Sequence, residues 1–260
     1  MTKKSTLWYS FQGSKYEGEE PSFYDTATLP WVAELEANWT VIAAELETLL
    51  IEQEDSLIPY PSHVLASVPS QWRTIAFSFW GLQNTENCKR CPQTFALLKK
   101  IPYMVSGIFS LLEPGTTVKP HRGDTNATIR CHLGLSIPSE DTALCGIKVG
   151  SKVQPWAEGK VMAFCDAHLH TAWNHSPSRR FVLIIDVMQP TYANQMGRVC
   201  CQVMASIYLA TAYQRSEFLR RYLRGKNIRF LFQKGLGLLA RLSKALGQSE
   251  LPAYSKVIKA

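Results

Sequence analysis

Residues 118–138 read VKPHRGDTNATIRCHLGLSIP, and this stretch decides the fold. From Ala127 to Ile137 apolar and polar residues alternate, which is the pattern of a β-strand with one face against a core. His132 lies within this run, and His121 precedes it by the turn-rich segment HRGDTN. The stretch therefore predicts a strand of a β-rich fold with imidazole side chains on or beside it.

Further strand-like runs extend this pattern on both sides. They cover residues 72–81, 104–113, 145–150, 160–166 and 180–188, and turns such as EPGT, AEGK and HSPS separate them. Many short strands without helices between them are typical of an antiparallel sandwich or barrel. We therefore expect a mainly β core.

Helical patterns lie on either side of this core. Apolar residues at helical spacing predict a helix after Pro30, a short one within residues 91–102, and helical structure from Gln195 to Gly247 with breaks near Gly225 and Gly235. The chain divides accordingly into an irregular leader (1–22), a β-rich domain (23–192) and a basic helical extension (193–260).

Composition limits the class of protein. The 260 residues are 46% hydrophobic and 19% charged, which excludes wholesale disorder. Seven cysteines at irregular spacing suit a reducing compartment. The first residues lack the apolar core of a signal peptide, and no apolar run approaches the ~18 residues that span a bilayer. We expect a cytoplasmic location.

The net charge of +7 is concentrated near the C-terminus. Residues 214–247 contain nine Lys or Arg and one Glu, so this segment alone carries +8. Its cations alternate with Phe, Leu and Ile, which suits either a helical appendage packed on the core or an amphipathic element on an anionic membrane. Nucleic acid is not an expected partner, because no nucleic-acid-binding fold accompanies the charge.

Three histidines gain meaning from their arrangement. A lone histidine on a strand is most often structural, but His121 comes early in the β core, His170 follows a late strand, and Arg180 opens the next strand. This layout is typical of a double-stranded β-helix oxygenase. Two imidazoles there hold iron, and a basic residue binds the distal carboxylate of 2-oxoglutarate through a bidentate fork.

Three stretches between residues 21 and 190 resemble the aspartyl/asparaginyl β-hydroxylase family of iron(II)/2-oxoglutarate dioxygenases. They are PSFYDTATLPWVAELEANW, FSLLEPGTTVKPHRGDTNATIRCHLGLSIP and WAEGKVMAFCDAHLHTAWNHSPSRRFVLIIDVMQP. The family has H-x-G where related oxygenases have H-x-D, so the resemblance implies that Gly123 is the family state. It also implies a double-stranded β-helix (jelly-roll, cupin-like) core.

The resemblance assigns roles to residues of this chain. His121 and His170 would be the iron ligands, and Asp166 would hold a water in the vacant ligand position. Ser110 and Arg180 would bind the distal carboxylate of 2-oxoglutarate, with Arg130 and His132 near its other carboxylate. The reaction would consume O2, with ascorbate as a supporting reductant, and hydroxylate a β-carbon of an aspartyl or asparaginyl unit, or an acyl chain, of a peptide, amino acid or lipid-linked substrate.

Alternatives stay open at this stage. Asp124 could serve as an iron carboxylate in an H-x-x-D register, although its side chain should point away from His121. Glycine at position 123 also occurs in iron halogenases, and RGD at 122–124 matches an adhesion motif. A binding module without turnover and a cupin-like metal protein without 2-oxoglutarate are rival functions. Cys88 and Cys91 form a single CxxC, half of a zinc site, and a reduced structural pair is favoured.

Overall fold

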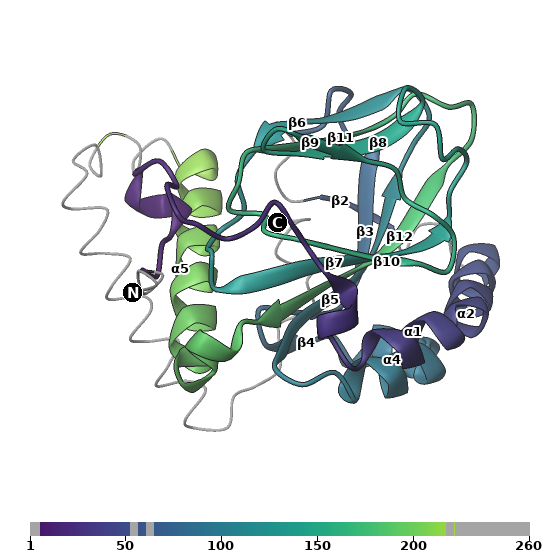
Figure 1. Ribbon diagram of the computed structural model, residues 1–260, viewed down its shortest axis with the longest axis horizontal. Coiled ribbons are helices and arrows are strands. Elements are labelled where there is room, and N and C mark those ends of the chain that lie inside the picture. Colours follow the sequence, from purple (N-terminus) through teal and green to yellow (C-terminus); the bar gives the residue numbers. More distant parts are fainter. Residues whose placement is uncertain (1–5, 53–56, 61–64, 217–220, 222–260) are drawn as a thin grey trace.

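The computed structural model describes residues 6–52, 57–60, 65–216 and 221. Two antiparallel sheets face each other and form a double-stranded β-helix (Figure 1). The larger sheet has the order β1-β10-β7-β12-β5-β3-β2, with β4 paired to β3, and the smaller sheet has the order β6-β11-β8-β9. The strands are β1 (Phe23–Tyr24), β2 (Ile58–Pro59), β3 (Trp72–Phe79), β4 (Leu82–Gln83), β5 (Met104–Leu112), β6 (Thr116–His121), β7 (Thr128–Ser136), β8 (Cys145–Val149), β9 (Lys152–Gln154), β10 (Val161–Phe164), β11 (His170–Asn174) and β12 (Arg180–Met188).

Helices cover the outer face of the larger sheet. They are α1 (Val32–Ala37), α2 (Trp39–Glu52), α3 (Thr85–Arg90) and α4 (Pro92–Lys99), and Figure 1 shows α1, α2 and α4 together below that sheet. Short 3-10 turns lie at Ser10–Gln12, Thr26–Thr28 and Pro190–Gln195. The helix expected after Pro30 is two helices, α1 and α2, which meet at Asn38.

The central strands are buried on both faces because each face packs on a different layer. All nine residues of β12 are buried. Its Val182 and Ile184 belong to the cluster between the two sheets, whereas Leu183 and Ile185 pack with the residues of α1–α4. Successive side chains of a strand point to opposite faces, so the continuous apolar run of β12 serves two cores at once.

The strands expected from alternation are present, but the two that carry His121 and His170 were not foreseen as strands. β6 lies at the edge of the smaller sheet, and it contains Pro120. Beyond its pairing with β11, β6 pairs within the described residues only through an isolated bridge between Ala66 and Val118, and proline is tolerated in such edge strands. A short strand interrupted by proline has little alternation, and this explains why the smaller sheet is weak in the sequence pattern.

The start of the C-terminal extension is a helix, as expected. α5 (Met196–Arg215) packs its Val199, Val203 and Met204 into the cluster between the sheets. The predicted breaks near Gly225 and Gly235, and the basic tail itself, lie outside the described residues. Within the described part of the chain, no helix is long and apolar enough to cross a membrane.

The described part of the leader, residues 6–22, contains no helix or strand apart from its 3-10 turn, yet its aromatic side chains are packed against the rest of the protein. Trp8, Tyr9 and Tyr16 are buried. The backbone N–H of Trp8 donates to Oδ1 of Asn126 at 2.7 Å, and Oγ1 of Thr125 donates to the carbonyl of Trp8 at 2.7 Å. The leader therefore holds the loop that follows His121.

The cysteine pair Cys88–Cys91 carries free, buried thiols. Burial raises the pKa of Cys88 to about 11 and that of Cys91 to about 12, so both thiols are protonated at neutral pH. This agrees with a reduced structural pair. Cys131, Cys145 and Cys165, which lie on or beside strands, are also fully buried.

Candidate active site

The two predicted ligand histidines face each other across neighbouring strands of the smaller sheet. His121 ends β6, His170 begins β11, and the two residues are register partners with ring centroids 4.1 Å apart. Nδ1 of His121 donates to the carbonyl of Lys119 at 2.8 Å, and Nδ1 of His170 donates to the carbonyl of His168 at 3.0 Å. A carbonyl only accepts, so each Nδ1 carries the proton and each Nε2 keeps its lone pair for a metal.

Burial keeps both imidazoles neutral. Desolvation lowers the pKa of His121 to about 4, and desolvation together with nearby His121 lowers the pKa of His170 well below its usual value. Neutral imidazole is the form that binds a metal, so neither ring has to lose a proton at physiological pH before it can do so.

Asp166 occupies the space that a side chain at position 123 would need. A Cβ built on Gly123 would lie 2.1 Å from Oδ2 of Asp166, and the N–H of Gly123 donates to the carbonyl of Asp166 at 2.7 Å. Asp166 is buried, and within the described part of the chain its Oδ1 has no hydrogen-bond partner. A carboxylate therefore stands beside the histidine pair, although it comes from the turn before β11 and not from residue 123.

Arg130 holds this carboxylate in place. Its Nη1 lies 3.1 Å from Oδ2 of Asp166, and its Nε and Nη2 bind Asp186 at 2.7 and 3.0 Å. Burial raises the pKa of Asp166 above its usual value, and the charge of Arg130 opposes that rise. Two buried carboxylates thus engage Arg130, and its predicted place near a carboxylate of 2-oxoglutarate stays a prediction.

The second group of predicted residues forms a buried cationic site. Arg180 is only 2% exposed, and its guanidinium lies 4.7 Å from the ring centroid of Trp156. Among the described residues, its Nε and Nη1 have no hydrogen-bond partner. Burial lowers the pKa of Arg180 to about 10. A buried charge without a counter-ion costs several kcal/mol, so this arrangement indicates a binding site for an anion.

His132 supplies another unused donor on the same inner face. Nε1 of Trp156 donates to Nδ1 of His132 at 3.2 Å, which places the proton of His132 on Nε2. That Nε2 is buried and has no partner among the described residues. Phe164 lies between this group and the histidine pair, because its ring centroid lies 5.0 Å from that of His132 and 5.8 Å from that of His170.

Ser110 lies diagonally across from Arg180 on the neighbouring strand. In the register of β5 and β12, Ser110 opposes Val182 and Leu112 opposes Arg180. Oγ of Ser110 accepts a hydrogen bond from Nε1 of Trp72 at 3.0 Å, so its own hydroxyl proton remains available to a ligand. Ser110, His132 and Arg180 therefore direct polar groups to the space between the sheets.

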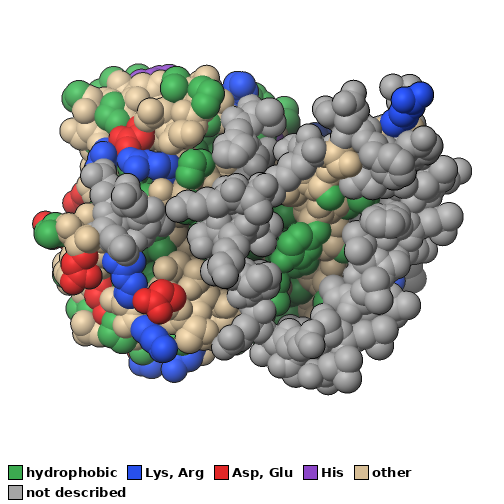
Figure 2. All heavy atoms as spheres, turned by 180° about the vertical axis from the view of Figure 1, so that it is seen from behind, with side chains coloured by type: hydrophobic (Ala, Val, Ile, Leu, Met, Phe, Trp, Pro, Cys, Tyr) green, Lys and Arg blue, Asp and Glu red, His purple; other side chains and the backbone are tan. Residues whose placement is uncertain are grey.

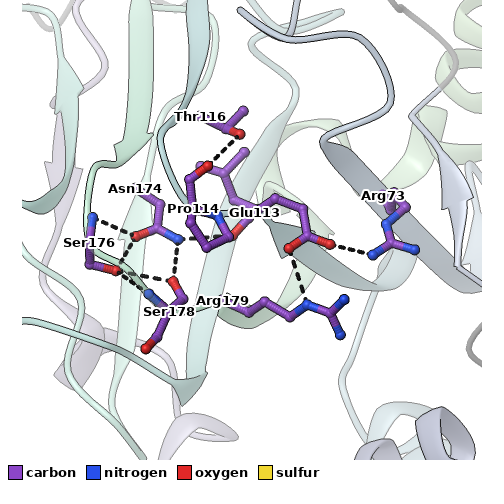
Figure 3. A network of polar contacts seen from close by, with 9 residues as sticks. Arg73, Glu113, Pro114, Thr116, Asn174, Ser176, Ser178 and Arg179 are labelled. Carbon is purple, nitrogen blue, oxygen red and sulfur yellow. Dashed lines mark hydrogen bonds and ion pairs between the residues drawn. The ribbon is translucent and has the colours of Figure 1, made fainter.

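A polar network fixes the turn that leads into Arg180 (Figure 3). Nδ2 of Asn174 donates to the carbonyls of Leu112 and Ser178 at 3.0 and 2.8 Å, while its Oδ1 accepts from the N–H and hydroxyl of Ser176 at 3.3 and 2.7 Å. Asn174 is fully buried. Asn174 thus joins β11, which begins with His170, to the end of β5 at Leu112, the residue that pairs with Arg180 at the start of β12.

The sequence did not single out every residue of the site. Trp156, Asn174 and three α5 residues that line a cavity with His121, namely Ile207, Ala210 and Thr211, were missed. A lone tryptophan in the segment QPWAEGK carries no signal of its own. Asp124 was weighed as an iron carboxylate, but its side chain is hydrogen-bonded to Trp80 and burial raises its pKa to about 6. Within the described ranges, no group of three His, Cys, Asp or Glu side chains could hold a metal ion.

The chain is similar to known hydroxylases. The family model described as aspartyl/asparaginyl beta-hydroxylase matches residues 36–190. An ornithine lipid ester-linked acyl 2-hydroxylase of Rhizobium tropici is 39% identical over 175 residues, which cover 65% of this chain and 61% of the relative. The human aspartyl/asparaginyl beta-hydroxylase is 33% identical over 181 residues, which cover 67% of this chain and 23% of the relative.

Each of these relatives is longer than the matched region, so the chain spans less than two thirds of their length. Among solved structures, a prolyl-4-hydroxylase of Pseudomonas putida is similar with a TM-score of 0.43 and 14% identity. The match covers 60% of this chain and 87% of that chain.

Proposed function

The chain belongs to the aspartyl/asparaginyl β-hydroxylase family, and from this we propose that it is an iron(II)- and 2-oxoglutarate-dependent hydroxylase. It would hydroxylate a β-carbon of an aspartyl or asparaginyl unit, or an acyl chain, and release succinate and CO2. The observation that carries the proposal is the pair of Arg180 nitrogens, Nε and Nη1, which are buried without a partner among the described residues. This unmatched cation suits the distal carboxylate of 2-oxoglutarate.

The histidine pair and the neighbouring Asp166 fit iron(II). His121 and His170 would hold it through Nε2, because their Nδ1 atoms are bound to backbone carbonyls. Bound iron(II) would supply the activation of dioxygen, driven by the decarboxylation of 2-oxoglutarate. Asp166 would accept a hydrogen bond from a water through Oδ1, the atom that has no partner within the described part of the chain.

The remaining residues would bind and orient the cosubstrate. Arg180 would donate from Nε and Nη1 to the distal carboxylate, with the hydroxyl of Ser110 as a further donor. His132 would donate from Nε2 toward the other carboxylate. The surrounding apolar residues Leu112, Val182 and Ile184 are buried, and they would keep water from the reacting atoms.

The first test is succinate formation from 2-oxoglutarate in the presence of iron(II) and ascorbate, without a substrate. We expect slow turnover that His170→Ala abolishes. Arg180→Lys keeps the charge but loses the planar fork, so it should weaken 2-oxoglutarate binding at least tenfold. If the purified protein neither forms succinate nor binds 2-oxoglutarate, a binding module without turnover or a cupin-like metal protein becomes the better description.

The proposal extends to surroundings and substrate. We propose a cytoplasmic enzyme whose basic tail contacts an anionic membrane and whose substrate is a peptide, an amino acid or a lipid-linked molecule. The acyl alternative is supported by the name of the Rhizobium tropici relative, which acts on an ester-linked acyl chain.

A further inference from the structure

A cavity of about 200 Å³ lies beside His121, and both polar and apolar side chains line it. Polar side chains come from residues 121–130, including His121, Arg122 and Arg130. Apolar side chains come from other parts of the chain: Tyr60, Leu65, Phe79, Ile207 and Ala210. The cavity therefore combines polar groups beside His121 with apolar side chains, and these apolar side chains are called its apolar wall.

Part of this apolar wall is α5. Ile207, Ala210 and Thr211 line the cavity, and their spacing of three and four places them on one helix face. One turn earlier the same helix buries Val203 and Met204 in the cluster between the sheets, and Ile207 packs partly buried against that cluster. The core thus holds α5 in place, and its last turns continue over the cavity.

The α5 part of this wall lies outside the residues that the family model matches. The family match ends at residue 190, and α5 begins at Met196. The histidines and the cationic site all lie within the matched region. The residues proposed for the chemistry therefore lie inside the matched region, whereas α5 adds cavity-lining side chains from outside it.

We propose that α5 determines substrate choice, with Ile207 and Ala210 accepting an apolar, acyl-like segment of the substrate next to the target carbon. The inference rests on the proposed function, since it takes the histidine pair as the reacting centre. An apolar wall gains free energy from a methylene chain, whereas a charged or strongly polar segment would lose its hydration against it. Arg122, which also lines the cavity, is suited to an ester carbonyl or an anionic head group, because a guanidinium has five N–H donors and its Nη1 donates to the carbonyl of Ala167.

The test compares binding of two probes to the full chain by calorimetry, a monodecanoyl phospholipid below its micelle concentration and an aspartyl peptide. We expect the wild-type protein to bind the phospholipid more tightly than the peptide. Ile207→Glu should weaken phospholipid binding about tenfold or more, since a charge replaces the apolar wall. The matched control is Tyr208→Glu, the adjacent residue, which is 38% exposed and does not line the cavity.

A second variant guards against misfolding. Ala210→Trp fills the cavity from an exposed position, and it should also weaken phospholipid binding while the melting temperature stays close to that of the wild type. Preference for the aspartyl peptide, or equal phospholipid binding by Ile207→Glu and Tyr208→Glu, would overturn the inference. Phospholipid binding that passes these tests in a protein that neither binds nor turns over 2-oxoglutarate would count against the proposed function alone.

Discussion

Gly123 and Asp166 are two halves of one feature at the scale of single residues. Because Gly123 has no side chain, there is room for the carboxylate of Asp166, which lies in the turn before β11. A Cβ at position 123 would lie only 2.1 Å from Oδ2 of Asp166. Glycine is needed here because of close approach, since its backbone has no positive φ. The carboxylate that is missing from the H-x-D pattern at position 123 is thus replaced in space by the buried carboxylate of Asp166, which fills the room that Gly123 leaves.

We expect Gly123→Ala to lower the free energy of unfolding by about 1–3 kcal/mol, because the new methyl group overlaps the buried carboxylate. Unfolding in urea measures the effect. Gly197→Ala is the matched control, since a Cβ at Gly197 meets nothing within 4 Å, and it should be neutral or slightly stabilising. Equal effects of the two substitutions would contradict the close-approach explanation.

His132 should make the stability of the metal-free protein depend on pH. Burial, with Arg180 and Arg130 nearby, lowers the pKa of His132 well below its usual value. The folded protein keeps the ring neutral, while the unfolded chain protonates it below about pH 6.5. Unfolding therefore takes up a proton, and stability falls as the pH falls. Buried Asp124 and Asp166, whose pKa values are raised, oppose this trend.

Replacing His132 isolates its contribution to the pH dependence of the unfolding free energy. We expect His132→Gln to reduce the pH slope of the unfolding free energy by up to about 1.4 kcal/mol per pH unit between about pH 5 and 6.5. Urea unfolding at several pH values measures the slope. A slope that does not change in the variant would mean that His132 is protonated in the folded protein.

At the scale of elements, Asn174 links the strand that begins with His170 to the strand that begins with Arg180. Its side-chain amide uses both donors and accepts two hydrogen bonds, all within the turn and the end of β5. Glu113 adds an outer clamp through ion pairs with Arg73 and Arg179 (Figure 3). Arg180 is thereby held in place before any anion arrives.

We expect Asn174→Ala to cost about 2–4 kcal/mol of unfolding free energy, because buried carbonyls of Leu112 and Ser178 lose their donor. The variant should also need more 2-oxoglutarate for the same rise in melting temperature, as the position of Arg180 relaxes. Arg179→Ala is the control, since an exposed ion pair contributes about 0–1 kcal/mol. A destabilised Asn174→Ala with wild-type 2-oxoglutarate affinity would limit Asn174 to a structural role.

At the scale of the whole molecule, charge is distributed unevenly along the chain. Figure 2 shows Lys, Arg, Asp and Glu side chains interspersed on one side of the β-rich body. The excess of positive charge lies in residues 214–247, which contain nine Lys or Arg and one Glu. If this tail meets an anionic membrane, each cation near the surface contributes about 1 kcal/mol.

We expect the full chain to co-sediment with vesicles that contain anionic phospholipid, and a chain ending at Ser216 to lose most of this binding while it keeps α5. Raising the salt concentration should release the full chain, because salt screens the attraction. Neutral vesicles are the control. Equal sedimentation of both chains would exclude the tail as a membrane contact.

The sequence alone predicted the longer strands of the larger sheet, β3, β5, β7, β10 and β12, because their alternation or continuous apolar run leaves a clear pattern, but it did not predict β1, β2, β4 or the strand order. It also singled out His121, His170 and Arg180 as candidate site residues, through their layout along the chain and the resemblance to the family. Only the tertiary structure decided that Asp166 fills the space at Gly123, that Trp156 lies against Arg180, and that α5 lines the cavity beside His121. Each of these contacts joins residues far apart in sequence, and no local pattern encodes a distance across the fold. The short edge strand β6 was hidden for a related reason, since its pairing with β11, and not its own composition, makes it a strand.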